Sequence, residues 1–473
     1  MIFRSINKKR TAVRRRAALA ATLVAGSAAM VGCVSIPADR GTQSQTWVHD
    51  RLGFASDWSW TADRQRCIDQ SVRTLDADKT VSLALLCSPR MRHLYATLAL
   101  TQADVYEATR LSNPQFAISR LATGAPDSIV NTTWSISMHF VELLLLPMRQ
   151  RLGEERLFAS QQRVASEVMR LEADVRSAYV IYASSVSIAE LEQRAATAAQ
   201  LSSRTAEAFH IAGNISELQL SRERAAAIEA SVEANQAAVE VHRHRSALLN
   251  LMGIAPADPV GITAETPLPL PPLLQDDVNS LRRVARSQRL DLQALKLELA
   301  SSERVLSQQQ VSRWVDDLGV GYERERETGQ ATRSGPTASI GVPIFNTRKD
   351  LVLRARSKWE DAQATLSERE IVLENDAFSA MQTAQAAHKI SVAMREQLVP
   401  LRERITRLSQ REFNYQFIGA FELLAIKREE LDAYRKYLEA IRDEWRSHID
   451  VQRVAGGKLP PELIATSQAG ATP

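Results

Sequence analysis

Two closely spaced histidines could in principle bind a metal ion. His242 and His244 stand in VHRHRS, and imidazole is a common ligand of zinc. The surrounding residues predict a helix, on which side chains two positions apart point in different directions, so we expect two solvated histidines and no joint metal site. The sequence also has no Gly-rich phosphate loop, no Cys-x-x-Cys pair and no Gly-x-Ser-x-Gly elbow. It therefore predicts neither an enzyme nor a cofactor-binding protein.

The N-terminus has the layout of a secretory signal followed by a possible lipidation site. Seven cations precede an apolar run that is too short and one-sided to span a membrane. The run ends in Met-Val-Gly-Cys, which resembles the lipobox of bacterial lipoproteins. We therefore expect Cys33 to become a lipidated N-terminus, with Val34 after it instead of an Asp that would favour the inner membrane. The alternative is ordinary cleavage after a small residue such as Ala29.

The other two cysteines and the charge describe the mature chain. In an exported chain the even pair Cys67 and Cys87 predicts a disulfide, and two buried thiols are the alternative. The full sequence has a formal net charge of +4. Without the seven cations of residues 1–32, 52 Lys and Arg remain against 55 Asp and Glu, which gives −3. A nucleic-acid partner is therefore not supported.

The sequence contains two copies of a large unit. LEADVRSA at 171–178 returns as LENDAFSA at 373–380. In addition, FHIAGNISELQLSRE (209–223) aligns with FNYQFIGAFELLAIKRE (413–429) after two residues are inserted. Agreement over this length predicts an internal duplication. The alignment pairs Gly213 with Gly419, Leu218 with Leu424, Arg222 with Arg428 and Glu223 with Glu429.

Each copy contains a long helix with a seam of apolar and small side chains. Between about 150 and 210 such residues recur alternately four and three positions apart. This spacing predicts a helix of ~60 residues, ~90 Å long, that packs closely on its neighbours. A turn and a shorter helix follow each long helix, at about 216–252 and 420–453. The seam of the first copy consists of Val164, Val168, Leu171, Val175, Ala178, Tyr182, Ser185 and Ala189.

A β-hairpin is expected before each long helix. In SIVNTTWSISMHF (128–140), apolar and polar residues alternate strictly, as in a strand with one apolar and one polar face. If this strand belongs to a membrane barrel, we expect Trp134, Ile136 and Met138 to face lipid. The lumen of that barrel would be lined by the residues between and before them, which are Asn131, Thr133, Ser135 and Ser137.

The other three strands are expected at 114–122, 314–323 and 337–345, with the polar loop RERETGQATRSGP in the second hairpin. A soluble sheet packed on helices is the alternative. If the hairpins cross a membrane, the chain must oligomerise, because four strands cannot close a barrel and open edges do not survive in lipid. Two, three or four chains would supply 8, 12 or 16 strands, and eight leave no useful pore.

Taken together, these features resemble the outer-membrane efflux protein family, the TolC-like outer membrane factors, over about residues 90–455. RLDLQALKLELASSERVLSQQQ (289–310) is similar to the family's Arg-Pro-Asp-Leu helix start, with Leu290 in place of Pro. FHIAGNISELQL and YQFIGAFELLAIK resemble its two tip turns. GVPIFNTRKD (341–350) is similar to a strand-to-helix junction of the heavy-metal efflux branch, although the first junction lacks that branch's Gly-Gly-Lys-Arg.

The resemblance implies a mainly α fold with a β-barrel: a homotrimer with a 12-stranded outer-membrane barrel on a periplasmic tunnel of antiparallel coiled-coil helices. Such a channel docks on a periplasmic adaptor and an inner-membrane pump, and lipid surrounds its barrel. The domain division that follows is 1–32 signal peptide, 33–90 N-terminal periplasmic segment, 91–255 first repeat, 256–277 Pro-rich linker, 278–455 second repeat and 456–473 disordered tail.

The two turns are expected at the periplasmic mouth, far from the strands, where an adaptor would dock. The predicted tip residues are Phe209, Gly213, Leu218, Tyr415, Gly419 and Leu424. Arg222, Glu223, Arg428 and Glu429 would form ion pairs between helices that hold the mouth shut. The alternative is that these residues only cap and pack the hairpins.

Two other functions compete with efflux. One is the exit duct of a type I protein secretion system. The other is a periplasmic adaptor, which needs one helical hairpin inserted into β-rich domains. The sequence predicts two hairpins and no such domain, so an efflux channel is favoured.

Overall fold

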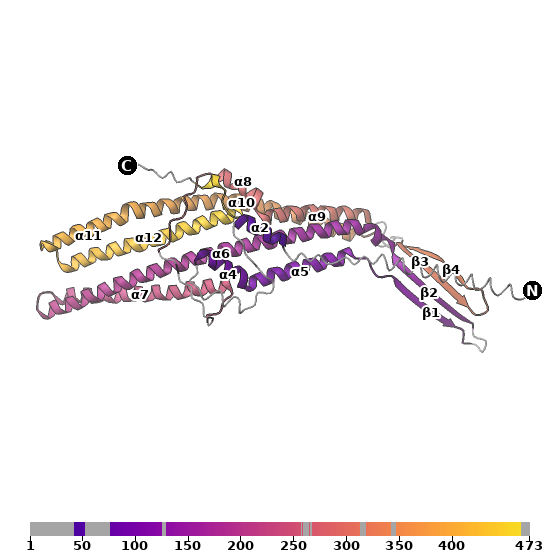
Figure 1. The fold of residues 1–473 in the computed structure, drawn as a ribbon, viewed down its shortest axis with the longest axis horizontal. Helices are drawn as coiled ribbons and strands as arrows, with labels where there is room; N and C mark the ends of the chain where they lie inside the picture. The colour runs from indigo at the N-terminus through magenta and orange to yellow at the C-terminus, as the bar shows by residue number, and fades with distance from the viewer. Residues whose placement is uncertain are drawn as a thin grey trace, which may run out of the picture.

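The protein is an elongated helical rod with a four-stranded sheet at one end and two helical turns at the other (Figure 1). The computed structural model describes residues 42–52, 76–124, 129–256, 258, 264, 267–312, 318–341 and 347–464. Within these ranges no helix has the length and apolarity that crossing a membrane requires.

The chain repeats one order of elements, which confirms the predicted succession of helix, hairpin, long helix and shorter helix. The first repeat consists of α5 (Pro89–Thr109), β1 (Gln115–Ala122), β2 (Val130–His139), α6 (Phe140–Ile211) and α7 (Glu217–Met252). The second consists of α8 (Val278–Gln288), α9 (Leu290–Ser312), β3 (Leu318–Glu327), β4 (Arg333–Ile340), α10 (Lys349–Ala393), the π-helix η1 (Met394–Leu398), α11 (Val399–Asn414) and α12 (Ala420–Ala455). Helices α2 (Thr42–Leu52) and α4 (Ala77–Cys87) precede them, and the 3-10 helix η2 (Pro461–Leu463) follows.

Helix α6 is the longest element, with 72 residues and therefore a length of ~108 Å. It begins at Phe140, directly after β2, rather than near residue 150 as predicted. The predicted seam is largely buried: Val168, Leu171 and Val175 are fully enclosed by α2, α4, α5 and α7. The heptad spacing therefore identified the packed face of this helix correctly.

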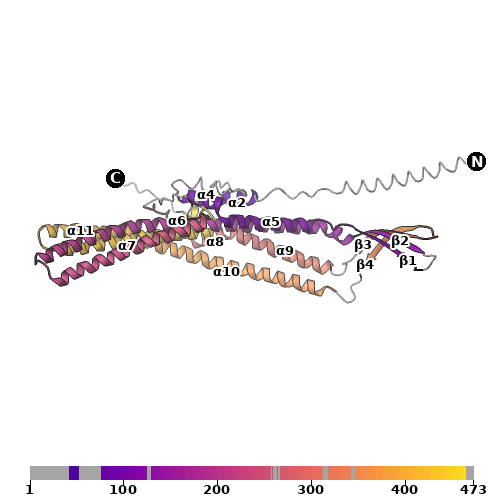
Figure 2. The same ribbon diagram turned by 90° about the horizontal axis from the view of Figure 1, so that it is seen from below.

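The corresponding rod of the second repeat is divided by η1. Pro400 lies near the start of α11, has no N–H, and its ring would clash with the carbonyl of Glu396 in a regular α-helix. The wider π-helical turn over Met394–Leu398 accommodates it. Figure 2 shows α10 diverging from α5 toward the sheet.

The predicted disordered tail is packed in its first part, so that prediction is wrong for residues 456–464. Lys458 donates its backbone N–H to the carbonyl of Arg51 at 2.8 Å, and Gln275 donates to the carbonyl of Leu463 at 3.0 Å. Leu463 is fully buried against α8 and α10. Isolated leucines in a Pro- and Gly-containing stretch carry no periodicity, so sequence patterning could not detect this contact.

The second hairpin is shifted along the chain relative to the prediction. The strands predicted at 314–323 and 337–345 lie instead at Leu318–Glu327 and Arg333–Ile340. Most of the expected loop RERETGQATRSGP is therefore strand. Because the alternation in this segment is between glutamate and arginine, neither face is apolar and the period of two was not recognised.

Candidate functional site

The four strands form one antiparallel sheet in the order β1-β2-β3-β4. Their register places Phe116 beside Ile136, and Ile136 beside Tyr322. The rings of Trp134 and Tyr322 lie 6.3 Å apart on this face. One side of the sheet is therefore an exposed apolar surface, which includes the three residues predicted to face lipid. Its members are Phe116, Ile118, Trp134, Ile136, Met138, Val320, Tyr322, Pro336, Ala338 and Ile340.

The opposite side of the sheet is polar. The register aligns Ser135 with Ala117 and Glu323, and Thr133 with Ser119 and Glu325. Asn131 donates from Nδ2 to Oε1 of Glu325 at 2.6 Å. All four residues predicted to face the lumen, Asn131, Thr133, Ser135 and Ser137, share this side with the carboxylates of β3.

The outer strands β1 and β4 each pair with one neighbour only among the described strands. Every residue of β1 is exposed. The sheet thus has two open edges and one apolar face at the end of the rod.

The first helical turn lies at the opposite end of the rod, between α6 and α7. Gly213 has φ +75°, the left-handed region in which glycine is strongly favoured. Its N–H donates to the carbonyl of His210 at 2.9 Å, and Asn214 donates to Phe209 at 2.8 Å. The Ser216 side chain then caps α7 by accepting from the N–H of Gln219 at 3.3 Å.

The second turn repeats this backbone without the predicted two-residue insertion. Gln416 has φ +63° and donates to the carbonyl of Phe413 at 2.9 Å, as Gly213 does to His210. Gly419 has φ −84° and is the N-cap of α12, where Ser216 stands in the first turn. The predicted equivalence of Gly213 and Gly419 is therefore wrong. Residue identity misaligned the repeats because Gln416 takes the left-handed position in place of glycine.

Large apolar side chains are exposed at both turns. Leu218 is 63% exposed and Tyr415 is 74% exposed, whereas Leu424 is half-buried. Phe209 is also exposed, and its ring meets that of Phe421 edge-on at 6.1 Å across the two hairpins. Sequence reasoning missed Phe417, which is 79% exposed. No sequence signal marked it, because the left-handed residue beside it at the apex of the turn is Gln416 and not a glycine.

Only some of the predicted ion-pair residues meet. Arg428 of α12 lies 3.5 Å from Glu223 of α7, so this contact joins the two hairpins. Glu429 instead pairs with Arg402 of α11, within its own hairpin. Arg222 is exposed and makes no ion pair with the residues that the structure describes.

Hydrogen bonds within the first hairpin hold the buried Glu223 carboxylate of the Glu223–Arg428 contact. Glu223 is only 6% exposed and accepts hydrogen bonds from Ser202 Oγ at 2.7 Å and from Gln219 Nε2 at 3.1 Å. These neighbours fix the carboxylate in place on α7, and the Arg428 side chain reaches it from the other hairpin.

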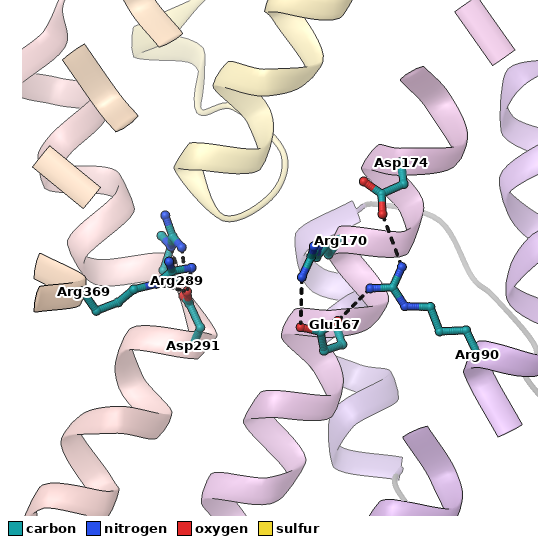
Figure 3. Close-up of polar contacts among 7 residues, drawn as sticks. All are labelled: Arg90, Glu167, Arg170, Asp174, Arg289, Asp291 and Arg369. Atoms are coloured by element: carbon teal, nitrogen blue, oxygen red, sulfur yellow. Dashed lines mark hydrogen bonds and ion pairs between the residues drawn. The ribbon is translucent and has the colours of Figure 1, made fainter. Parts of the chain in front are cut away.

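A second set of ion pairs lies near the middle of the rod (Figure 3). Asp291 at the start of α9 accepts from Arg289 at 2.6 and 2.9 Å and from Arg369 of α10 at 2.9 and 3.1 Å. Burial raises the pKa of Asp291, but the hydrogen bonds and charges of the two arginines outweigh it and hold the pKa at about 2. The Arg-Leu-Asp-Leu segment thus ties the second repeat together.

The first repeat has its own mid-rod cluster, also visible in Figure 3. Arg90 of α5 reaches Glu167 at 2.9 Å and Asp174 at 3.3 Å on α6, and Arg170 lies 3.8 Å from Glu167. Both clusters adjoin a cavity of about 690 Å³, whose lining includes Glu167 and Asp291. These charges hold helices together, and the arrangement contains no nucleophile with an adjacent base.

The two predicted histidines have different surroundings. His242 is exposed, and His244 Nε2 lies 3.3 Å from Glu240. No group of three or more His, Cys, Asp or Glu side chains that could hold a metal occurs in the described part of the chain.

Cys87, at the end of α4, is disulfide-bonded, while Cys67 and Cys33 lie outside the described residues. The Cys67–Cys87 pairing and the lipidation of Cys33 remain predictions.

Comparisons with known proteins agree with this geometry. No family model matches the sequence, and no curated protein matches it. Among solved structures, the Campylobacter jejuni CmeC outer membrane channel is 13% identical, with a TM-score of 0.68, over 87% of this chain and 90% of that one. The Neisseria gonorrhoeae MtrE outer membrane channel in its open state is 17% identical, with a TM-score of 0.65, over 80% and 89%.

The chain has the fold of these outer membrane channels. CusC, whose structures concern transmembrane channel formation, is a third match at 13% identity and a TM-score of 0.65, over 81% of this chain and 92% of that one. The resemblance stated from the motifs is thereby confirmed for the fold, and these neighbours are channels, not enzymes.

Proposed function

We propose that this protein is the outer-membrane channel of a tripartite efflux system. It would be a passive exit duct for substrates, heavy-metal cations or drugs, that an inner-membrane pump delivers through a periplasmic adaptor. The observation that carries the proposal is the sheet with one apolar and one polar face at the end of a helical rod. Such a sheet suits a wall between lipid and water.

The open strands support a trimer. The edges of β1 and β4 would be satisfied by pairing with other copies of the chain, because a bilayer core offers no other partners for backbone groups. Three copies give 12 strands and a wide lumen. The helices supply a matching surface, since α10 diverges from α5 and exposes Leu353, Ile371 and Phe378.

The remaining assignments follow from this orientation. The sheet lies in the outer membrane, Cys33 is a lipid anchor, and the helices extend through the periplasm. The two turns form the periplasmic mouth, where Leu218 and Tyr415 present apolar surface to adaptor hairpins. Glu223 and Arg428 contribute to a closed gate.

The test starts from protein extracted from outer membranes. We expect a trimer that dissociates on heating, a mature N-terminus acylated at Cys33 by mass spectrometry, and single-channel conductance in planar bilayers. Cross-links from Leu218→Cys to a co-expressed adaptor would identify the mouth. A monomeric protein in the periplasmic fraction without conductance would overturn the proposal. Co-purification with a peptide-exporting ATPase, instead of a proton-driven or metal pump, would favour type I secretion.

A further inference from the structure

Strand β3 separates its charges between the two faces of the sheet. Its distal half reads Glu323-Arg324-Glu325-Arg326-Glu327, and alternate side chains of a strand point to opposite faces. The three glutamates are half-buried on the polar face, whereas both arginines are exposed on the face that carries Tyr322. The apolar face of the sheet thus ends in positive charge.

A third arginine lies on the same face, in the outer strand β1. Arg120 of β1 pairs with Thr132, and Thr132 pairs with Arg326, so the two arginines flank one residue in the same row. Arg324 lies one row nearer the helices, directly beside Trp134. Neighbouring strands are ~4.8 Å apart, so the backbones of Arg120 and Arg326 are separated by about 10 Å. We call Arg120, Arg324 and Arg326 the arginine collar.

No carboxylate of the described residues pairs with the collar. In the described ranges none of its three guanidinium groups forms an ion pair, and the carboxylates of β3 lie on the other face. Under the proposed function this face meets lipid, where an arginine is costly at the bilayer midplane but tolerated near the interface. The collar therefore lies at the level of the headgroups, with Trp134 and Tyr322 next to it as an aromatic belt.

We propose that the arginine collar binds the phosphate groups of lipopolysaccharide in the outer leaflet of the outer membrane. The inference rests on the proposed function, which places the hairpin loops outside the cell and the helices in the periplasm. The collar is near the loops, so the lipid that faces it belongs to the outer leaflet. Guanidinium groups bind phosphate through paired, charge-assisted hydrogen bonds, and three exposed ones can hold one phosphorylated headgroup.

The experiment uses the trimer extracted from outer membranes and delipidated in detergent. Binding of purified lipopolysaccharide, and of the same lipid after enzymatic dephosphorylation, is measured by native mass spectrometry. We expect the wild type to bind the phosphorylated lipid at least about tenfold more tightly than the dephosphorylated one, a difference worth ~1.4 kcal/mol. The variant Arg120→Gln/Arg324→Gln/Arg326→Gln should lose that difference.

A matched control separates the collar from general charge. Arg333 lies in β4 opposite Glu325, on the polar face, so Arg333→Gln removes one charge from the same region of the sheet. Arg326→Gln should weaken lipopolysaccharide binding severalfold while Arg333→Gln leaves it unchanged. This pair of single variants also decides the question if the triple variant fails to assemble.

Three outcomes would overturn the inference. These are equal binding of the two lipids by the wild type, equal binding by Arg326→Gln and Arg333→Gln, and displacement of the lipid by millimolar inorganic phosphate, which would indicate a site for a soluble anion. Conductance of the same trimers in planar bilayers keeps the two proposals distinguishable. Conducting trimers without selective lipid binding refute the collar alone, whereas a wild type that neither trimerises nor conducts refutes the proposed function.

Discussion

Arg428 of α12 reaches across to Glu223 of α7, with Nη2 3.5 Å from Oε2, and this contact ties the two helical hairpins together near their turns. The neighbouring Glu429 pairs with Arg402 inside its own hairpin. Arg428 therefore joins the two hairpins, whereas Glu429 joins two helices of the same hairpin. Of these two ion pairs, only the one between Arg428 and Glu223 must break for the hairpins to separate.

In the proposed channel, reversing the charge at Arg428 should therefore open the periplasmic mouth. Each lost pair removes ~1 kcal/mol, so three symmetric copies would raise the open fraction on the order of 100-fold. We expect Arg428→Glu to admit a large antibiotic that wild-type cells exclude, measured as a fall in the inhibitory concentration. Glu429→Arg should leave exclusion intact, and Glu223→Arg combined with Arg428→Glu should restore it. Equal leakage from both single variants would remove the gating role.

The two faces of β2 should respond oppositely to the same substitution. Ile136 is on the apolar face, so under the proposed function Ile136→Arg would place a charge in lipid at a cost of ~2–4 kcal/mol and should block assembly of the proposed heat-dissociable trimer. Ser135 is on the polar face beside Glu323, so Ser135→Arg should assemble normally and change the conductance. If both variants assemble equally well, the sheet does not separate lipid from water.

The two turn glycines should differ in their tolerance of a side chain. Gly213 has φ +75°, where a Cβ costs ~1–2 kcal/mol, so Gly213→Ala should lower the unfolding midpoint. Gly419 has φ −84° and caps α12, so Gly419→Ser should be neutral or stabilising by a few tenths of a kcal/mol. Thermal unfolding followed by circular dichroism compares them. A larger loss at Gly419 would contradict the observed backbone of the second turn.

Sequence patterning predicted the long elements well because their burial repeats along the chain. The seam of α6 around Val168 and Leu171 recurs every seven residues and is enclosed as expected. The alternation around Trp134 likewise gave the faces of β2. In both cases the pattern is repeated by many residues, so a single residue that departs from it does not change the predicted element.

Patterning failed where one contact or one dihedral decides the structure. Arg324-Glu325-Arg326-Glu327 has the period of a strand but no apolar face, so a loop was predicted there. The left-handed residue of the second turn is Gln416, and an alignment that matches glycine to glycine cannot find it. Glu223 and Arg428 were predicted to form ion pairs between helices, but their pairing with each other depends on how two hairpins sit in space, which no local spacing encodes.

The mid-rod ion pairs should make stability depend on pH through Asp291. Its pKa in the folded protein is about 2 and its usual value is about 3.9, so its contribution is fully present above pH 4 and is lost as the pH falls toward 2. This shift corresponds to about 2 kcal/mol. Asp291→Asn should therefore lower the free energy of unfolding by about that amount at pH 6, in urea titrations followed by circular dichroism, and the gap to the wild type should close between pH 4 and pH 2. Asp276→Asn, which neutralises an exposed carboxylate nearby in the chain, should show no such gap at either pH. A difference between wild type and Asp291→Asn that persists unchanged at pH 2 would mean that Asp291 stabilises the rod through packing and not through its charge.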